Sequence, residues 1–513
     1  MSELKVSELK VSELKVVMFR RLQVAAFVVA AVVVGVGSGC LPTLAENPPR
    51  DARLALPDRF SPDDETLAAA AQASVGTKDW RGYFASPPLR ALVDDALNNN
   101  QELNIQLQEL VIGRAEVDAR FGEIFPQVSA GVDAGIEKVG GNTSQGAADL
   151  LTGTPEHLPN FGFGLHASWE VDIWGKLRDA TSAAKARYRA SVEGRHFMVT
   201  QLVAEIARSY YELAALDNQV NVVERNIEIQ KSALDIVRIQ KDAARVTQLA
   251  VQRFEAEVLK NRARLFDLQQ QQVVLENRIN FLVGRTPRHV DRDPAVFTAP
   301  LPMLLEAGVP SELLKNRPDV RQAELRLEAT KLDVNVARAN FYPALSIDAD
   351  LGYNAFNLLH LISTPESLAY NLAGNLAAPI LNRPAIEAQY RTANALQMQA
   401  VFGYEKTVLQ AYTDVVNQLV TFKNLRQSYD LVAEQVSTLQ SSIEISNVLF
   451  QSARADYMEV LLTRRDALDA ELELIETRQR LWQSTVDLYQ ALGGGWQGPA
   501  APSAAAIITT SAP

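Results

Sequence analysis

The chain has 513 residues, of which 47% are hydrophobic and 22% are charged, and its formal net charge is −11. A chain of this length can build a large core or several domains. Its acidic balance argues against nucleic acid as a partner, because surfaces that bind nucleic acid are basic. The single cysteine leaves no disulfide framework and no thiolate metal cluster.

The first part of the chain has the pattern of a processed leader. Residues 1–17 hold three copies of Ser-Glu-Leu-Lys-Val, whose period matches neither a helix nor a strand. Residues 18–39 begin with Met18 and contain a short basic segment, an apolar run and small residues, in the order of a secretory signal peptide. We expect translation to start at Met18 and residues 1–17 to be an upstream extension. An uncleaved anchor helix is the alternative, although the apolar run is short for a membrane span.

The chain's only cysteine follows this segment directly. Small residues before Cys40 resemble a bacterial lipobox, in which the thiol is acylated and the cysteine becomes the new N-terminus. The pattern departs from the family at Gly37, where Leu is usual. Leu41 is not the Asp that commonly retains such lipoproteins in the inner membrane, so sorting to the outer membrane is expected. Residues 40–75 are rich in Pro and Ala and predict an acylated, extended tether.

Two stretches of the chain repeat one order of elements. In residues 113–135 and again in 329–352, a helical pattern ends at an aromatic residue followed by proline, and a strand-like alternation begins directly afterwards. A duplicated unit fixes the architecture of a chain. We therefore expect a first structural repeat over residues 76–300 and a second over 301–497. Residues 498–513 consist mainly of Pro, Ala, Ser and Thr and predict a disordered tail.

Alternation with a period of two predicts four β-strands, at about 127–138, 160–171, 344–354 and 370–380. Each has one apolar side and one small or polar side, as in a membrane strand between lipid and water. Outer-membrane barrels need about eight strands or more, so an oligomer must pool its strands. Two soluble hairpins packed on helices are the alternative. The expected loops between the strands are 140–160 and 355–369.

The polar sides of these strands are acidic. They carry five carboxylates and hardly any base. If these sides line a pore, the pore should prefer cations, because rings of one charge concentrate the opposite ions. The acidic residues expected to face the lumen are Asp133, Glu137, Glu170, Asp348 and Asp350.

The remaining chain is strongly helical. Long helices are expected over 175–285 and 385–492, where no proline occurs, with weak breaks at 242–247 and 452–456. The first arm of each block has about 65 residues and would be about 100 Å long, which exceeds any globular domain. Apolar residues recur every seven residues on two adjacent stripes, which favours a closed ring of helices that each touch two neighbours. A two-stranded coiled coil is the alternative.

No catalytic constellation is present in the sequence. The five histidines are scattered without the spacing of metal ligands, and no glycine loop for phosphate occurs. We expect neither an enzyme nor a cofactor, and no metal site.

Five longer stretches resemble the TolC-like outer-membrane efflux proteins. They occur in the order found in that family and lie within residues 41–497, so they are far more specific than a single short motif. The most similar subgroup is that of the lipoproteins paired with resistance-nodulation-division (RND) pumps. The stretches are DWRGYFASPPLRALVDDALNNNQEL (79–103), SWEVDIWGKLRDA (168–180), RPDVRQAELRLEATKLDVNVARANFYPALS (317–346), YEKTVLQAYTDVVNQL (404–419) and YQALGGGW (489–496).

The resemblance implies an α/β membrane protein that is mainly α. In this family a homotrimer forms a twelve-stranded β-barrel in the outer membrane, with four strands per chain, and a long α-helical barrel continues it through the periplasm. The chain would be the exit duct of a tripartite efflux system, with a periplasmic adaptor and an inner-membrane RND pump as partners, and Cys40 would anchor it in outer-membrane lipid. A duct for type I protein secretion is the alternative, with a periplasmic coiled-coil adaptor further behind. The substrate is left open.

The resemblance also implies a gated periplasmic end at the two helix turns. It places Met458 at a hydrophobic constriction and Arg465 at the position of a gate arginine. Leu462 occupies a position where relatives carry an aspartate, so Asp456 or Asp466 would have to supply the acid. The alternative for Arg465 is an ordinary solvated charge. The helix tips expected to contact the adaptor are Arg245, Val246, Thr247, Arg454, Ala455 and Asp456.

Overall fold

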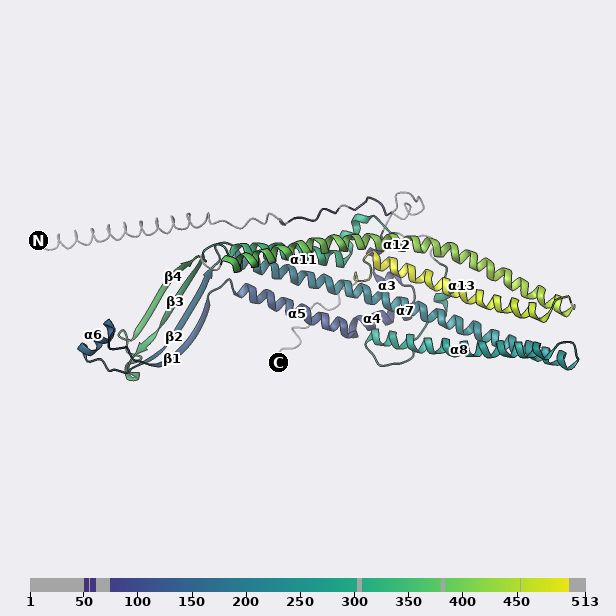
Figure 1. The fold of residues 1–513 in the computed structure, drawn as a ribbon, viewed down its shortest axis with the longest axis horizontal. Coiled ribbons are helices and arrows are strands. Elements are labelled where there is room, and N and C mark those ends of the chain that lie inside the picture. Colours follow the sequence, from purple (N-terminus) through teal and green to yellow (C-terminus); the bar gives the residue numbers. More distant parts are fainter. Residues whose placement is uncertain are drawn as a thin grey trace. The chain divides into compact units, whose positions relative to one another are not determined.

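The computed structural model describes residues 50–54, 56–60, 74–301, 307–379, 383–452 and 454–497. The expected extension, signal peptide, Cys40, much of the tether and the tail therefore lie outside the described residues. The chain divides into two compact units, drawn in Figure 1. The first, called here the sheet unit, comprises Met1–Asp51, Gly113–Tyr188 and Arg326–Val401, and the second, the helical unit, comprises Ala52–Ile112, Arg189–Leu325 and Phe402–Pro513.

Four strands form one antiparallel sheet in the sheet unit. Their spatial order is β1-β2-β3-β4, so chain neighbours are also sheet neighbours, and β1 and β4 form the two edges (Figure 1). The strictly alternating sequence favours this pleated arrangement, since successive side chains point to opposite faces. The strands are β1 (Gln127–Glu137), β2 (Leu158–Val171), β3 (Ala344–Ala355) and β4 (Leu368–Ala377).

The register of the sheet separates polar from apolar side chains. Asp133 lies opposite Gly162, and His166 lies opposite Asp350. Because directly opposite residues share a face, the small and polar positions of all four strands form one surface, called here the polar face. The other surface, the apolar face, carries large side chains that are exposed in the single chain, such as Val132 at 86% and Tyr370 at 81%.

The connections between the strands differ from the expected plain loops. The segment 140–160 contains helix α6 (Ser144–Thr152), because Thr143 Oγ1 accepts a hydrogen bond from the amide of Gly146 and Gly153 ends the helix at a φ of 73°. The segment 355–369 contains a short 3₁₀ turn, η4 (Leu358–His360). Strand β4 begins and ends earlier than the expected 370–380. Its earlier end follows from Pro379, which lacks the N–H that a continuing ladder needs.

Long helices make up most of the chain. Helices α7 and α12 have 67 and 69 residues, and α5, α7, α11 and α12 contribute residues to both units. Across the described residues, no helix has both the length and the hydropathy required for a bilayer span. The main helices are α4 (Pro87–Asn99), α5 (Gln101–Gly122), α7 (Lys176–Asp242), α8 (Gln248–Val283), α11 (Pro318–Ala339), α12 (Arg383–Gln451) and α13 (Tyr457–Ala491), and the short ones are η2 (Val75–Thr77), α3 (Trp80–Tyr83), α9 (Pro294–Thr298), η3 (Pro310–Glu312) and α10 (Leu313–Asn316).

An aromatic contact marks the main core of the helical unit. The ring of Tyr83 stacks on that of Tyr489 with centroids 4.1 Å apart. The Tyr83 hydroxyl donates to the carbonyl of Thr485 at 2.9 Å, and the Tyr489 hydroxyl donates to that of Lys78 at 2.7 Å. Burial raises the pKa of Tyr83 to about 12, so this core holds neutral, hydrogen-bonded phenols. The two hydrogen bonds therefore join the chain around Lys78 and Tyr83 to the distant chain around Thr485 and Tyr489.

Two matched contacts fasten helices in the two halves of the chain, one contact in each half. Asn100, just before α5, donates through its side chain to the carbonyl of Leu282 near the end of α8, at 2.7 Å. Arg317, just before α11, donates to the carbonyl of Ala491 at the end of α13, at 3.0 Å. Each contact satisfies a carbonyl that a helix C-terminus leaves without an intrahelical partner.

Glycines complete the same two joints. Gly284 follows α8 with a φ of 78°, and Gly493 follows α13 with a φ of 83°, the left-handed region that disfavours side chains. A Cβ atom would collide with the carbonyl oxygen of Asn99 in the first case and with that of Asn316 in the second. Close backbone approach therefore requires glycine at both positions.

We predict that Arg317→Met strongly destabilises the helical unit. The buried guanidinium donates to Asp319 at 2.7 Å and to Asp414 at 3.2 Å. Burial opposes its charge, but these two carboxylates raise the pKa of Arg317 above its usual range. The substitution leaves both carboxylates without this partner and should lower the free energy of unfolding by about 3–5 kcal/mol. Urea unfolding of the detergent-solubilised protein, followed by circular dichroism, measures the change.

The matched control is Arg264→Met. Arg264 makes an exposed ion pair with Asp469 at 3.0 Å, and such pairs contribute about 1 kcal/mol or less. Equal losses in the two variants would contradict the assignment of Arg317 as a buried fastening.

Candidate functional site

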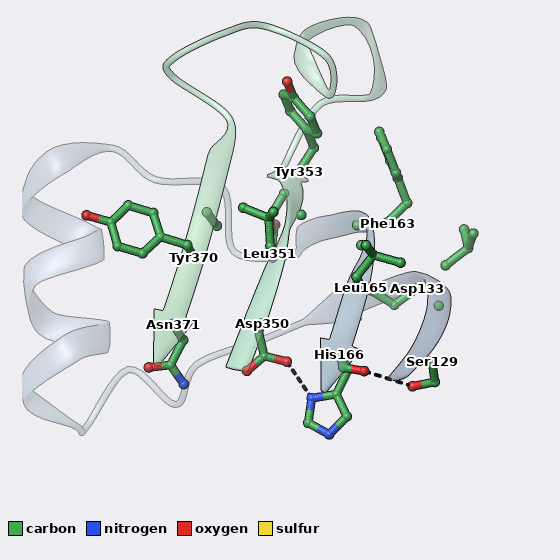
Figure 2. Close-up of a pocket in the computed structure, with 17 residues that line it drawn as sticks. Ser129, Asp133, Phe163, Leu165, His166, Asp350, Leu351, Tyr353, Tyr370 and Asn371 are labelled. Atoms are coloured by element: carbon green, nitrogen blue, oxygen red, sulfur yellow. Dashed lines mark hydrogen bonds and ion pairs between the residues drawn. The ribbon is translucent and has the colours of Figure 1, made fainter. Parts of the chain in front are cut away.

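A row of polar side chains crosses the polar face of the sheet. Ser129, His166, Asp350 and Asn371 are register partners on β1, β2, β3 and β4. Figure 2 shows the last three extending side by side from their strands. His166 Nδ1 lies 2.6 Å from Asp350 Oδ1, which is a short contact for a hydrogen bond.

A row of three glycines and one alanine lies beside it. Gly131, Gly164 and Gly352 are opposite one another on β1, β2 and β3, and Ala369 continues the row on β4. We call these four positions the glycine row. They border a hollow of about 440 Å³ on the polar face, which Asp133 and His166 also line (Figure 2). The small residues thus leave room along the polar face.

All five carboxylates expected to face a lumen lie on this polar face. Two of them have basic partners: Glu170 pairs with Lys176 at the start of α7, and Asp350 pairs with His166. Asp348 accepts a hydrogen bond from Ser168 at 2.8 Å. The surplus of negative charge is therefore smaller than the sequence alone suggests. The set is Asp133, Glu137, Glu170, Asp348 and Asp350.

The turn end of the helical unit has its own small core, called here the tip cluster. Helices α7, α8 and α13 meet in it. Met458 packs against this cluster, and its sulfur lies 3.8 Å from Nη1 of Arg253 on α8. The expected constriction residue is therefore already held by neighbouring helices. The buried members are Leu234, Val237, Ala250, Val251, Phe254, Val258 and Leu461.

The other expected gate residues lie on the first turns of α13. Asp456 is the N-cap residue, and Leu462 is 39% exposed. Arg465 pairs with its chain neighbour Asp466 at 3.2 Å, both partners being about half exposed. In the single chain these charges thus interact with each other and with solvent.

Sequence reasoning missed Arg464, which precedes Arg465. Its Nη2 donates to Asn447 on α12 at 3.2 Å, and its Nε has no hydrogen-bond partner among the described residues. Burial lowers the pKa of the Arg464 guanidinium. The adjacent pair of arginines is the available signal in the sequence, but only packing against α12 distinguishes the half-buried member from the exposed one.

The expected adaptor contacts lie in the two turns. Thr247 caps α8 by accepting the amide of Ala250, Val246 packs against the tip cluster, and Arg245 is exposed. In the second turn Arg454 is exposed and Ala455 is partly exposed. Each turn therefore presents an arginine at its surface.

These features define a class of protein. A sheet with one polar and one apolar face and two unpaired edges, together with very long helices in the same chain, is the pattern expected of an outer-membrane channel protein. The family model described as outer membrane efflux protein matches residues 92–285 and 309–494, and the chain belongs to this family. The resemblance predicted from the sequence is thereby confirmed. The chain is an outer-membrane efflux duct, and its family is not one of enzymes.

Curated relatives match most of the chain. The pyoverdine export outer membrane protein OpmQ of Pseudomonas aeruginosa is 28% identical, over 88% of this chain and 93% of the relative. The probable outer membrane lipoprotein SilC of Salmonella typhimurium is 26% identical, over 86% of this chain and 93% of the relative. The cation efflux system protein CusC of Escherichia coli K12 is 25% identical, over 89% and 97%.

Solved structures have the same fold. The outer-membrane channel OprN is 25% identical with a TM-score of 0.78, over 90% of this chain and all of that one. The open state of the Neisseria gonorrhoeae channel MtrE is 22% identical with a TM-score of 0.76, over 89% of this chain and 98% of that one.

No three His, Cys, Asp or Glu side chains in the described ranges are placed to hold a metal ion.

We predict that Gly164→Ala impairs folding of the sheet, whereas Gly131→Ala does not. A Cβ on Gly164 would lie 2.7 Å from the carbonyl oxygen of Leu351 and 2.8 Å from the Cα of Gly352, so the strands would have to separate. A Cβ on Gly131 meets nothing within 4 Å. The yield of folded, heat-modifiable protein from outer membranes should fall several-fold for the first variant only. Similar yields would contradict the close approach of β2 and β3.

Proposed function

We propose that three copies of this chain form the outer-membrane exit duct of a tripartite efflux system. The observation that carries the proposal is the sheet with open edges at β1 and β4. Unpaired backbone groups are costly in lipid, so β1 of one copy pairs with β4 of the next until the ring closes. Two copies would already reach the minimum of about eight strands. The family resemblance leads us to three copies and a twelve-stranded barrel.

The two faces of the sheet orient this barrel. The exposed apolar face suits lipid, and the acidic polar face suits a water-filled lumen. The helical unit also exposes large apolar side chains, including Phe266 and Phe281 on α8 and Leu431 and Val448 on α12. Neighbouring copies would cover these side chains in a helical barrel that continues through the periplasm.

An internal two-fold repeat, over 76–300 and 301–497, supports a ring of similar units. The family model matches the chain in two segments, one within each half. Asn100 and Arg317 make matched contacts in these halves. Three chains would then supply six similar helix assemblies around one axis.

Conduction through this duct is passive. The energy comes from the inner-membrane RND pump. A periplasmic adaptor joins that pump to the helix tips, which are Arg245, Val246, Thr247, Arg454, Ala455 and Asp456. The surplus of carboxylates on the polar face gives the duct a preference for cations. Relatives are named for pyoverdine export and for cation efflux, so the substrate follows from the pump rather than from the fold.

The gate lies at the start of α13. Met458 and Leu462 form its hydrophobic part, and Arg465 forms its charged part with Asp456 or Asp466. The tip cluster joins α13 to α7 and α8, so opening moves these helix ends together.

Acylated Cys40, after removal of residues 18–39, adds a lipid anchor in the outer membrane, in keeping with a relative named as a probable outer membrane lipoprotein.

Mass spectrometry tests assembly and anchoring. The membrane-extracted protein should have an acylated Cys40 as its N-terminus, and native mass measurement of the detergent complex should give a trimer. Cys40→Ser should lose the acyl chains while remaining trimeric, because the strand edges, not the lipid, hold the copies together. A soluble monomer, or a mature chain that retains Met18, would overturn the assembly or the anchor respectively.

Channel recordings test the gate. Met458→Ala and Leu462→Ala should each raise the single-channel conductance in planar bilayers, because both shorten side chains at the constriction. Ile445→Ala on α12, which removes an apolar side chain that is 60% exposed and lies outside the expected gate, is the control and should leave the conductance unchanged. Equal conductance in all variants would place the constriction elsewhere.

A further inference from the structure

One basic side chain interrupts the acidic polar face. At the register-paired positions of this face the four strands carry five carboxylates, and His166 is their only basic residue. Imidazole is the side chain whose ordinary titration falls between pH 5 and 8. Among the register-paired residues of this face, His166 is therefore the one whose residue type can change charge near neutral pH.

The geometry couples this histidine to one carboxylate. His166 Nδ1 lies 2.6 Å from Asp350 on β3, and the two side chains are 52% and 50% exposed. In Figure 2 the second ring nitrogen points away from Asp350. Ser129 on β1 donates through Oγ to the backbone carbonyl of His166 at 3.5 Å, a long distance for a hydrogen bond. Asp348 on β3 accepts a hydrogen bond from Ser168. The imidazole can therefore exchange protons with water while it remains beside Asp350.

We propose that His166 is a specificity-determining residue that makes the cation preference of the duct depend on pH. The inference rests on the proposed function, in which the polar face lines the lumen. With neutral His166, Asp350 contributes a full negative charge to the lumen. When His166 is protonated, the pair becomes neutral and the preference for cations weakens.

The number of charges makes the effect measurable. Five carboxylates and the partner Lys176 leave a net charge of −4 per copy on this face, and protonated His166 reduces it to −3. In a closed ring every copy changes at the same depth, since His166 occupies one register row. Clustered charges of one sign set the local concentration of counter-ions in a narrow pore. An exposed ion pair contributes little stability, so the change concerns selectivity rather than folding.

Reversal potentials in planar bilayers under a potassium chloride gradient provide the test. For the wild-type trimer, the ratio of potassium to chloride permeability should fall about twofold between pH 7.5 and pH 5.5. His166→Asn keeps a hydrogen-bond donor beside Asp350 but cannot titrate, so its ratio should stay constant. His360→Asn and His157→Asn, in the connections between strands, are matched controls that should retain the fall. Native mass measurement checks that each variant is a trimer, and His166→Gln serves if His166→Asn does not assemble.

Two carboxylate variants separate this inference from the proposed function. Asp133→Asn and Asp350→Asn should lower the permeability ratio at pH 7.5, and Asp350→Asn should retain a fall on acidification because it keeps the imidazole of His166. If neither variant changes the ratio of a conducting trimer, the polar face does not line the lumen and the proposed orientation fails. If both lower it while His166→Asn retains the wild-type fall, only the role of His166 is overturned.

Discussion

The unpaired edges of a four-stranded sheet are the constraint on which the rest of this structure depends. Strands β1 and β4 each present a row of backbone groups without a partner in the chain, and lipid offers none. A chain with one apolar and one polar face cannot resolve this alone, because four strands are too few to close a barrel. Oligomerisation is therefore a physical requirement of the proposed membrane location, and the exposed apolar side chains of α8 and α12 have the same need.

The helical unit contains two joints of similar geometry, one at the end of α8 and one at the end of α13. At each repeat joint, a side chain before one helix satisfies the last carbonyls of another, and a glycine with positive φ allows the close approach. The chemistry differs between the halves. Asn100 is neutral, whereas Arg317 brings a charge that needs Asp319 and Asp414 beside it. The two joints therefore have similar geometry but are held by different residues.

Stability is distributed unevenly along the helices. The main core of the helical unit combines aromatic stacking, buried ion pairs and close backbone contacts around Tyr83, Tyr489 and Arg317. The tip cluster has only a few buried side chains, from the ends of α7 and α8 and the start of α13. Segments with few buried apolar contacts open at lower free energy than a core. The tip cluster should therefore open more readily than the main core, in keeping with the gate proposed at the start of α13.

Sequence by itself determined the kinds of elements and the family of this protein. Alternation placed Asp133, Asp348 and Asp350 on one side of their strands, because side chains in a strand repeat every two residues, and the long motifs predicted the efflux family that the comparisons confirm. It could not supply the strand register, which joins His166 to Asp350 across 184 residues and aligns the glycine row. It also missed helix α6 and the burial of Arg464 against α12. Periodicity acts between chain neighbours, whereas pairing and burial depend on which distant segments pack together, and only the tertiary structure decides that.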